Sequence, residues 1–256
     1  MTRWRPPASV GALLLIVLVI AAWEFLPRVI AFPRAFVTTP SAAVGAIVEE
    51  PARFTDALAA TLAEFGPAFL ISAGGGVLIG LLLGSFPQLQ FGRSYLAVLY
   101  AVPLVMVYPL LTAWLGLDSM TRIVFGGLYG IIPTALTTAA SVATMDRTWI
   151  ETARSMGAKP MTVVRRVVVP LTLPGIFAAL RVGGGLTFIA VIIGQLLASN
   201  RGLGFILTTA RTRFEVDALY AAVIIVMLLA LAINVVLYAI ERSLSPWPKG
   251  TLKGAG

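Results

Sequence analysis

The stretch Glu151–Gly175, ETARSMGAKPMTVVRRVVVPLTLPG, is a long charged segment in a chain otherwise dominated by apolar runs. Thr148 predicts the N-cap of a helix, because Glu151 follows three residues later, as a capping box requires. Gly157 predicts a sharp break, because glycine adopts left-handed backbone conformations without strain. A second short helix is expected over about 161–169, where two prolines stop it. The expected structure is therefore a helix, a tight turn and a helix.

The charge of this segment predicts that it lies outside the bilayer. Counted from residue 146, it carries five basic side chains and two acidic ones, so the segment is expected in water on the cytoplasmic, positive side of a membrane. The basic residues are Arg147, Arg154, Lys159, Arg165 and Arg166, and the acids are Asp146 and Glu151.

The same segment resembles the cytoplasmic EAA loop of the permease subunits of ATP-binding-cassette (ABC) importers. That pattern is Glu-Ala-Ala, three residues, Gly, then an apolar position and Leu-Pro ahead of an apolar span. Thr152 stands where the family usually has alanine, and this departure adds a hydroxyl group. The residues that carry the resemblance are Glu151, Ala153, Gly157, Pro170 and Pro174.

The resemblance implies that the loop over about 144–170 forms coupling helices that sit in a cleft of a cytoplasmic ATPase subunit. Small residues would let a helix seat deeply in a partner's groove, and the glycine would permit the turn between the helices. An ordinary basic loop would explain the charge pattern but not the Glu-Ala-Gly-Pro spacing. The residues expected to dock are Glu151, Thr152, Ala153, Arg154, Met156, Gly157 and Ala158.

The composition is typical of a polytopic membrane protein. Hydrophobic residues make up 59% of the 256 residues and charged residues 12%, with a mean hydropathy of +0.94; about a quarter of the residues are charged in soluble domains. The sequence contains no cysteine and no histidine, so it offers no thiolate and lacks the commonest general base and metal ligand. No catalytic residue, metal site or cofactor is therefore predicted. The net charge of +8 is dispersed among loops, which favours orientation in a membrane over nucleic-acid binding.

Apolar runs of sufficient length predict an all-α membrane protein with about six transmembrane helices in a single permease domain. The first run is expected to be an uncleaved span, because no small-x-small cleavage site followed by a soluble domain is present. Short helices outside the spans are expected after Thr39 and within 199–217. The predicted spans cover about 10–26, 61–84, 94–115, 123–142, 173–197 and 218–240.

Small residues in the second span predict close helix packing. Gly76, Gly80 and Gly84 recur at four-residue intervals and form a flat ridge, for which packing within the chain is favoured over a role in a moving gate. Arg181, near the inner end of the fifth span, is expected either to extend toward the lipid headgroups or to pair inside the bundle.

Four side chains are candidates to face a transport pathway. Pro103 and Pro109 predict a kinked third span beside that pathway, with simple packing as the alternative for the polar residues on it. Hydroxyl groups in a span usually bond to their own helix, and an amide in a span usually bonds to another helix, so each candidate has a structural alternative. The candidates are Tyr108, Thr112, Thr138 and Gln195.

The distribution of charge predicts the orientation of the spans. With both termini in the cytoplasm, eleven basic residues and three acids lie inside, whereas seven basic residues and seven acids lie outside. The inside total includes Arg3, Arg5, Lys249 and Lys253, and the outside total includes Arg122 and Glu64, which are assigned to a turn and to the outer end of a span.

The resemblance extends from about Thr39 to Trp247. It is specific for the permease superfamily and less specific for one branch, the importers of sulfonates, nitrate, taurine and thiamine precursors. It implies a type I importer of the bacterial plasma (inner) membrane. The stretches that carry it, besides the central loop, are AVPLVMVYPLLTAWLGLD (Ala101 to Asp118), NRGLGFILTTARTRFEVDALYA (Asn200 to Ala221) and ERSLSPW (Glu241 to Trp247).

The partners that the resemblance implies are two cytoplasmic ATP-binding subunits, a second permease subunit in a homodimer, an extracytoplasmic solute-binding protein and membrane lipid. The sequence has no G-x-x-x-x-G-K-[ST] phosphate loop, so ATP hydrolysis is expected in a separate subunit. The implied cargo is a small anionic or heterocyclic solute.

Two other classes of function compete with this interpretation. A membrane enzyme would need convergent carboxylates, a metal cluster or an activated nucleophile, and no pair of acids lies within the predicted spans. An ATP-independent channel or facilitator is the stronger alternative, because a kinked third span and a glycine-rich fifth span would also suit it. A channel would conduct alone, whereas an importer subunit would require an ATPase.

Overall fold

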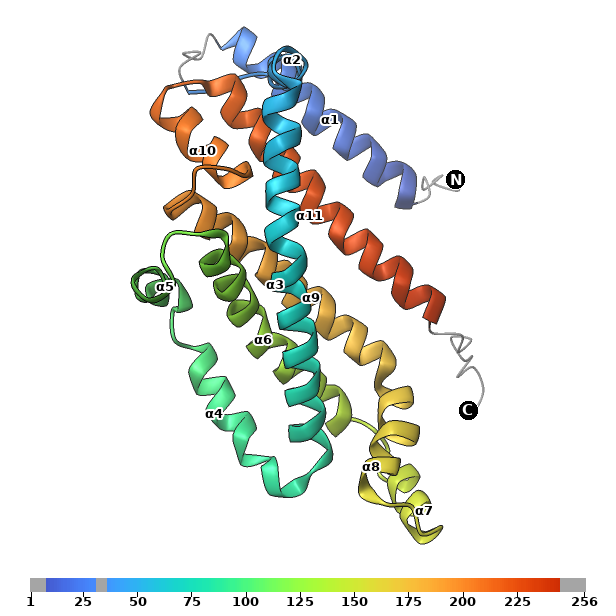
Figure 1. The fold of residues 1–256 in the computed structure, drawn as a ribbon. Helices are drawn as coiled ribbons and strands as arrows, with labels where there is room; N and C mark the ends of the chain where they lie inside the picture. The colour runs from blue at the N-terminus through green and yellow to red at the C-terminus, as the bar shows by residue number, and fades with distance from the viewer. Residues whose placement is uncertain (1–7, 31–35, 245–256) are drawn as a thin grey trace, which may run out of the picture. The chain divides into compact units, whose positions relative to one another are not determined.

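The computed structural model describes residues 8–30 and 36–244, and the secondary structure within these residues is helical (Figure 1). Arg3, Arg5, Arg34, Lys249 and Lys253, which entered the charge count, lie outside the described residues, as does the end of ERSLSPW. The chain divides into two compact units: Met1–Ala60 with Asn200–Met227, and Thr61–Ser199 with Leu228–Gly256.

The first unit is built around two short helices that the sequence predicts. Helix α2 begins at a proline after the N-cap Thr39, whose hydroxyl group accepts a hydrogen bond from the backbone N–H of Ala42. The indole N–H of Trp23 donates to the carbonyl of Thr38 at 3.0 Å, which ties the segment before α2 to α1. The elements are α1 (Ala8–Val29), α2 (Pro40–Glu49), the start of α3 (Pro51–Ser85), α10 (Leu203–Thr212) and the start of α11 (Val216–Leu244).

The second unit contains the remainder of α3 and α11 and all the helices between Pro87 and Leu197. Helices α6 and α9 pack against each other along much of their lengths (Figure 1). The remaining elements are η1 (Pro87–Leu89), α4 (Phe91–Tyr100), η2 (Leu104–Val107), α5 (Tyr108–Leu115), α6 (Ser119–Ala143), α7 (Thr148–Ser155), α8 (Pro160–Val163), the π turn η3 (Val164–Val168) and α9 (Val169–Leu197).

Four helices of the described residues are long and apolar enough to cross a membrane: Pro51–Ser85, Ser119–Ala143, Pro160–Leu197 and Val216–Ser243. A fifth crossing results if the bent pair Pro87–Tyr100 and Leu104–Leu115 is one span. The predicted first span, 10–26, lies within α1, and its passage through a membrane stays a prediction, as does the total of six.

The third predicted span is broken rather than kinked. Its two halves meet at 79°, because α4 ends at Tyr100 and a short 3-10 turn follows Pro103 before α5 begins. Pro109 lies in the first turn of α5, where its missing N–H costs no helical hydrogen bond. The two prolines therefore separate two helices.

The second helix of the central loop does not end at Pro170 and Pro174, so this prediction is wrong. A continuous helix runs from Pro160 to Leu197. Just before Pro170 it widens into the π turn, in which the N–H of Val169 donates to the carbonyl of Val164. A π turn is one way for a helix to continue past a proline, whose nitrogen has no hydrogen to donate.

The glycine ridge on α3 packs within the chain, as predicted. A methyl group on Gly76 would lie 2.5 Å from Cβ of Thr134, and one on Gly80 would lie 2.5 Å from Cβ of Thr138. The four-residue spacing on α3 thus matches a four-residue spacing on α6, which lets the two backbones approach closely.

The α6–α9 crossing also depends on glycines packed against threonines. A methyl group on Gly130 would lie 2.1 Å from Oγ1 of Thr187, and one on Gly183 would lie 1.8 Å from Oγ1 of Thr134. Each helix presents a glycine to a threonine of the other, so α3, α6 and α9 form one tightly packed group.

We expect Gly80→Ala to lower the free energy of unfolding by about 1–3 kcal/mol, because the new methyl group would also lie 2.6 Å from the backbone oxygen of Ala135. Gly74→Ala, on the same helix, is the control, since no atom lies within 4 Å of a Cβ there. Thermal unfolding of the purified protein in detergent checks both variants. Equal midpoints for the two would contradict the packing described here.

Candidate functional site

An elbow, residues 144–170, follows α6, and its second part is the start of the long helix Pro160–Leu197. Helix α7 ends in a Schellman motif, in which the N–H of Gly157 donates to the carbonyl of Arg154 at 2.9 Å and that of Ala158 donates to Ala153 at 3.1 Å. Gly157 has φ +80°, a left-handed conformation that other residues rarely adopt. The break predicted at Gly157 is confirmed.

The start of α7 differs from the prediction. Thr148 is the first helical residue rather than the N-cap, and its backbone N–H donates to Oδ1 of Asp146 at 2.9 Å. The Asp146 carboxylate thus satisfies a free N–H at the helix start, where a negative charge is also favoured by the helix dipole. Hydrogen bonds from the backbone and then the hydroxyl of Thr148 hold the pKa of Asp146 below its usual value.

One face of the elbow is anchored to the bundle. Ala153 and Ala158 pack against a buried cluster formed by Val142, Val163 and Val168. These two alanines are the residues paired by the Schellman motif, so the turn and the apolar contact stabilise each other. The elbow is therefore attached firmly to the end of α6 and to the start of the long helix.

The opposite face of the elbow is open to water. Met156 is 83% exposed, and Trp149 is 59% exposed. Glu151 and Arg154 are also exposed and form no salt bridge with any described residue. An exposed indole and thioether beside unpaired charges is the composition of a protein-docking surface. Sequence reasoning missed Trp149, although a large apolar residue on a short polar helix was the available signal.

A second polar centre lies buried in the same unit. The Glu64 carboxylate of α3 accepts hydrogen bonds from Arg122 Nε at 2.9 Å and Nη2 at 2.7 Å, both on Oε1. Its Oε2 accepts from Gln195 Nε2 at 2.8 Å. Each of these three residues is at most 2% exposed. We call Glu64, Arg122 and Gln195, with Thr61 and Ser119 bonded to them, the polar clamp.

The polar clamp corrects two assignments made from the sequence. Arg122 was expected in a turn outside the bundle, but it lies in the first turns of α6 with its charge paired. Glu64 was counted among the external acids, but it is buried within α3. The available signal was that Glu64 fell inside the predicted span 61–84, where an ionised residue needs a partner.

The structure brings two of the four pathway candidates, Tyr108 and Gln195, close together, and no hydrogen bond among the described residues joins Thr112 or Thr138 to them. Tyr108 is buried, and its hydroxyl donates to the carbonyl of Gly194 at 3.0 Å, next to Gln195 in the polar clamp. Thr112 is half-buried and donates to the carbonyl of Pro109. Thr138 is fully buried, and its hydroxyl has no hydrogen-bond partner among the described residues. Contact of any of them with cargo stays a prediction.

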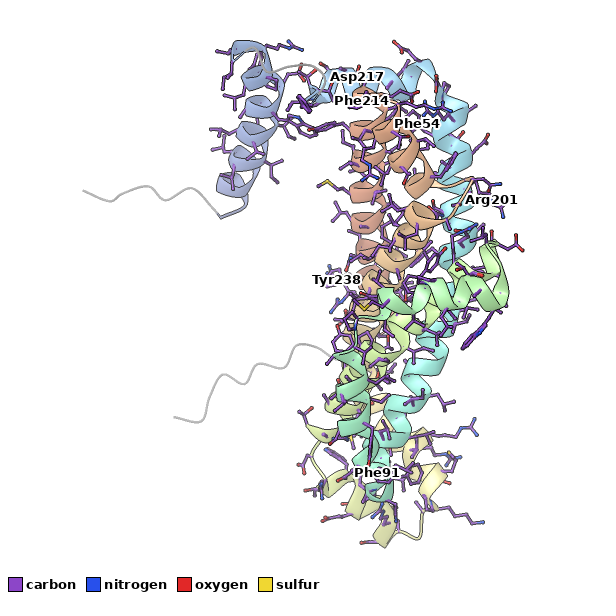
Figure 2. The ribbon with its side chains drawn as sticks, turned by 90° about the vertical axis from the view of Figure 1, so that its left-hand side faces the viewer. Phe54, Phe91, Arg201, Phe214, Asp217 and Tyr238 are labelled. Carbon is purple, nitrogen blue, oxygen red and sulfur yellow. The ribbon has the colours of Figure 1, made fainter. Side chains whose placement is uncertain are left out.

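Arg181 pairs inside the bundle, the second of the two alternatives. It forms a salt bridge with Glu241 of α11. Its guanidinium group also lies 5.8 Å from the centre of the Tyr238 ring, which Figure 2 labels on α11. This pair links α9 to α11 in the way that the polar clamp links α9 to α3 and α6.

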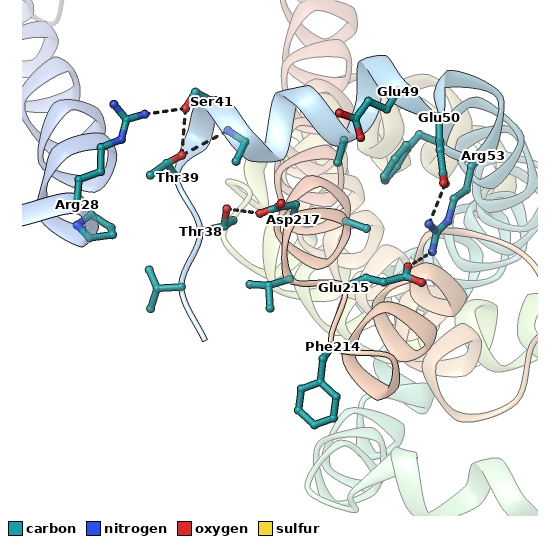
Figure 3. Close-up of a pocket in the computed structure, with 17 residues that line it drawn as sticks. Arg28, Thr38, Thr39, Ser41, Glu49, Glu50, Arg53, Phe214, Glu215 and Asp217 are labelled. Carbon is teal, nitrogen blue, oxygen red and sulfur yellow. Dashed lines mark hydrogen bonds and ion pairs between the residues drawn. The ribbon is translucent and has the colours of Figure 1, made fainter. Parts of the chain in front are cut away.

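The first unit contains a pocket of ≈ 1150 Å³ (Figure 3). Arg53 on its wall bonds to Glu50 at 2.9 Å and to Glu215 at 2.8 Å, and the hydroxyl of Thr38 donates to Asp217. These contacts join α2, α3 and the start of α11. No group of three or more acidic, histidine or cysteine side chains that could hold a metal ion occurs in the described part of the chain.

Comparisons with known proteins agree with this architecture. The family profile described as "Binding-protein-dependent transport system inner membrane component" matches residues 72–249. The taurine transport system permease protein TauC of Escherichia coli is 29% identical over 203 residues, covering 77% of this chain and 74% of that protein. The riboflavin transport system permease protein RibX of Chloroflexus aurantiacus is 30% identical over 152 residues, covering 59% and 57%.

A solved structure of the MetNI methionine ABC transporter, in an inward facing conformation, has a similar fold. Its TM-score is 0.64 at 21% identity, and the match covers 72% of this chain and 93% of that chain. At this level of identity the likeness concerns the fold alone.

We expect Glu64→Ala to destabilise the protein by about 3–5 kcal/mol, because it leaves the buried Arg122 charge without its partner. Glu50→Ala removes the carboxylate of a partly exposed pair with Arg53 and should cost only about 0–1 kcal/mol. Thermal unfolding midpoints in detergent measure the difference. Similar midpoints for the two variants would show that the polar clamp is not closed as described.

Proposed function

Because the chain belongs to the family of binding-protein-dependent transport system inner membrane components, we propose that its elbow couples ATP hydrolysis in a separate subunit to movement of the membrane helices. The chain is the permease subunit of an ABC importer and not an enzyme. The alternative of an ATP-independent channel or facilitator is set aside by this family membership.

The exposed elbow is the observation that carries the coupling proposal. Its outer face offers Glu151, Arg154 and Met156 to a partner, and its inner face is fixed to the bundle through Ala153 and Ala158. A force applied to α7 would therefore reach the long helix that begins at Pro160 without loss in a flexible linker. Rigid-body rocking of packed helices is the movement that such an attachment suits.

The Schellman turn decides the orientation of that outer face. Gly157 sits with open space around it, so its role is conformational and not one of close packing. Of the predicted docking set, Glu151, Thr152, Arg154 and Met156 are proposed to contact the partner, whereas Ala153 and Ala158 hold the elbow against the bundle and Gly157 forms the turn between them.

We also propose which proteins the chain binds and how it is oriented in the membrane. The chain works with cytoplasmic ATP-binding subunits, a second copy of itself and an extracytoplasmic solute-binding protein, with both termini in the cytoplasm of a bacterial cell. The elbow then faces the cytoplasm, which agrees with its excess of basic residues. Arg165 and Arg166, both exposed after α8, are placed to contact lipid headgroups or acidic groups on the ATPase.

The cargo class is proposed from the relatives. TauC is named for taurine, a small sulfonate, and its similarity to this chain covers more of the chain than the similarity to RibX, which is named for the heterocycle riboflavin. We therefore place a small organic sulfonate first and a heterocyclic solute second. The solute-binding protein would select between them before the cargo reaches the membrane.

Gly157→Val should uncouple ATP hydrolysis from transport while leaving membrane insertion intact, because a side chain in left-handed conformation costs about 1–2 kcal/mol and would tilt α7. Gly157→Asn is the matched control, since asparagine tolerates this conformation. The measurement is the stimulation of ATP hydrolysis by the binding protein in proteoliposomes. Full stimulation of the valine variant would count against the coupling role.

Taurine is the first cargo to test. The assembled importer in proteoliposomes should accumulate radiolabelled taurine only when ATP and the binding protein are both supplied, because the permease lacks a phosphate loop of its own. Riboflavin is the parallel probe for the second class. Uptake of either compound by the permease alone would overturn the importer mechanism, and uptake of riboflavin alone would reverse the order of the cargo classes.

A further inference from the structure

The helix that begins at the elbow reaches the polar clamp. Pro160–Leu197 is one helix of 38 residues, which corresponds to roughly 57 Å at the usual rise per residue. The elbow includes the first turns of this helix, and Gln195 lies two residues before the helix ends. A displacement applied at α8 is therefore delivered along the helix to the residues that hold its far end.

At that far end the Glu64 carboxylate joins three helices. Oε1 of Glu64, on α3, accepts hydrogen bonds from Arg122 on α6 and from the hydroxyl of Ser119 at 2.8 Å. Oε2 accepts from Gln195 on α9, whose own oxygen accepts from Thr61 of α3 at 3.1 Å. One carboxylate thus connects α3 with α6 and with α9 at the same level.

Arg122 also bonds to the backbone just before α6 and just after α9. Nη1 donates to the carbonyl of Leu117, in the turn before α6, at 3.1 Å and to that of Ala198, just after α9, at 2.9 Å. Nη2 also reaches Ser119 at 3.2 Å, so every N–H of the guanidinium group has a partner. No donor of Arg122 is left for cargo, which makes it a positioning residue in this conformation.

The contacts between α6 and α9 below the polar clamp are of a different kind. They are made by glycines packed closely against hydroxyl-bearing side chains, and the hydroxyl of Thr187 has no hydrogen-bond partner among the described residues. Close packing of small residues resists separation of two helices, but directional charged hydrogen bonds also resist sliding and rotation. The polar clamp is therefore the feature that fixes the axial register of α9 against α3 and α6.

We propose that the Glu64–Arg122 pair, together with Gln195, is the positioning group that makes the far ends of α3, α6 and α9 move as one body when the elbow is displaced. This inference rests on the proposed docking of the elbow to an ATPase. A buried ion pair contributes little net stability compared with apolar residues of similar size, but it can specify one arrangement among several. In this protein the specified arrangement is the register of the transmitting helix.

The test measures movement between α6 and α9 directly. Because the sequence contains no cysteine, Met120→Cys and Leu197→Cys introduce two unique labelling sites, both at exposed positions near the polar clamp and outside it. In complexes that combine one labelled copy of the chain with one cysteine-free copy, spin labels at these sites report the distance between the start of α6 and the end of α9 within one copy. The complex with its ATPase, in nanodiscs, is measured without nucleotide and with ATP plus vanadate.

With the native polar clamp we expect one narrow distance that is the same in both conditions. In Glu64→Met/Arg122→Met, which replaces the pair by apolar side chains and leaves no buried charge, we expect the distance to broaden or shift when ATP and vanadate are added. Stimulation of ATP hydrolysis by the binding protein should fall by about tenfold, within the usual range of coupling between sites. Glu64→Gln keeps hydrogen-bonding atoms at the same position. Its change in distance and its loss of stimulation should be intermediate between those of the native protein and the double variant. It replaces the double variant in the test if that variant does not assemble.

Arg181→Met/Glu241→Met is the matched control, because it removes an ion pair that joins α9 to α11 and should leave the α6–α9 distance unchanged. A nucleotide-dependent change of that distance with the native polar clamp would overturn the inference. The inference would also be overturned if Glu64→Met/Arg122→Met kept the native distance in both conditions and the native stimulation of ATP hydrolysis. If the native complex shows no stimulation by the binding protein, the proposed coupling function fails instead, and the distance measurement still reports on the polar clamp.

Discussion

A polar group inside a bilayer has no water to bond to, and this constraint governs how the second unit of the protein is built. Glu64, Arg122 and Gln195 are each almost completely buried, and they satisfy one another. Removing one partner would leave an uncompensated charge, so the three helices that carry these residues must be placed so that all three side chains meet. The charged group thus adds directional hydrogen bonds to the glycine–threonine packing, and the two together specify one register of the helices.

Small residues provide a second constraint, because they decide how closely the helices α3, α6 and α9 can approach one another. In lipid there is no gain from burying one apolar surface against another, and close approach of backbones takes the place of the hydrophobic effect. Gly76 and Gly80 of α3 face threonines of α6, and Gly130 and Gly183 face threonines across the α6–α9 crossing. Close packing through the middle of the group and charged bonds at one end make it stiff. Stiffness is what a subunit needs if force applied at one end is to have an effect at the other.

The elbow follows a different rule because most of its residues are exposed. Its backbone groups can be solvated, so its shape is set by local signals: the Asp146 carboxylate at the start of α7 and the left-handed Gly157 at its end. Only its inner face, with Ala153 and Ala158, depends on the rest of the fold. This division leaves an outer face of exposed charges and apolar groups, while the inner face is packed against the bundle.

The sequence by itself determined the helical membrane class, the position of the elbow and the break at Gly157, because hydropathy, charge and glycine conformation act over a few neighbouring residues. It also predicted the glycine ridge on α3, whose spacing is visible in one segment. Tertiary structure alone decided that the helix continues past Pro170, since that depends on a π turn, and that the third span is broken at Pro103. The pairing of Glu64 with Arg122 was likewise decided in three dimensions, because it joins residues on two different helices whose register no local pattern records.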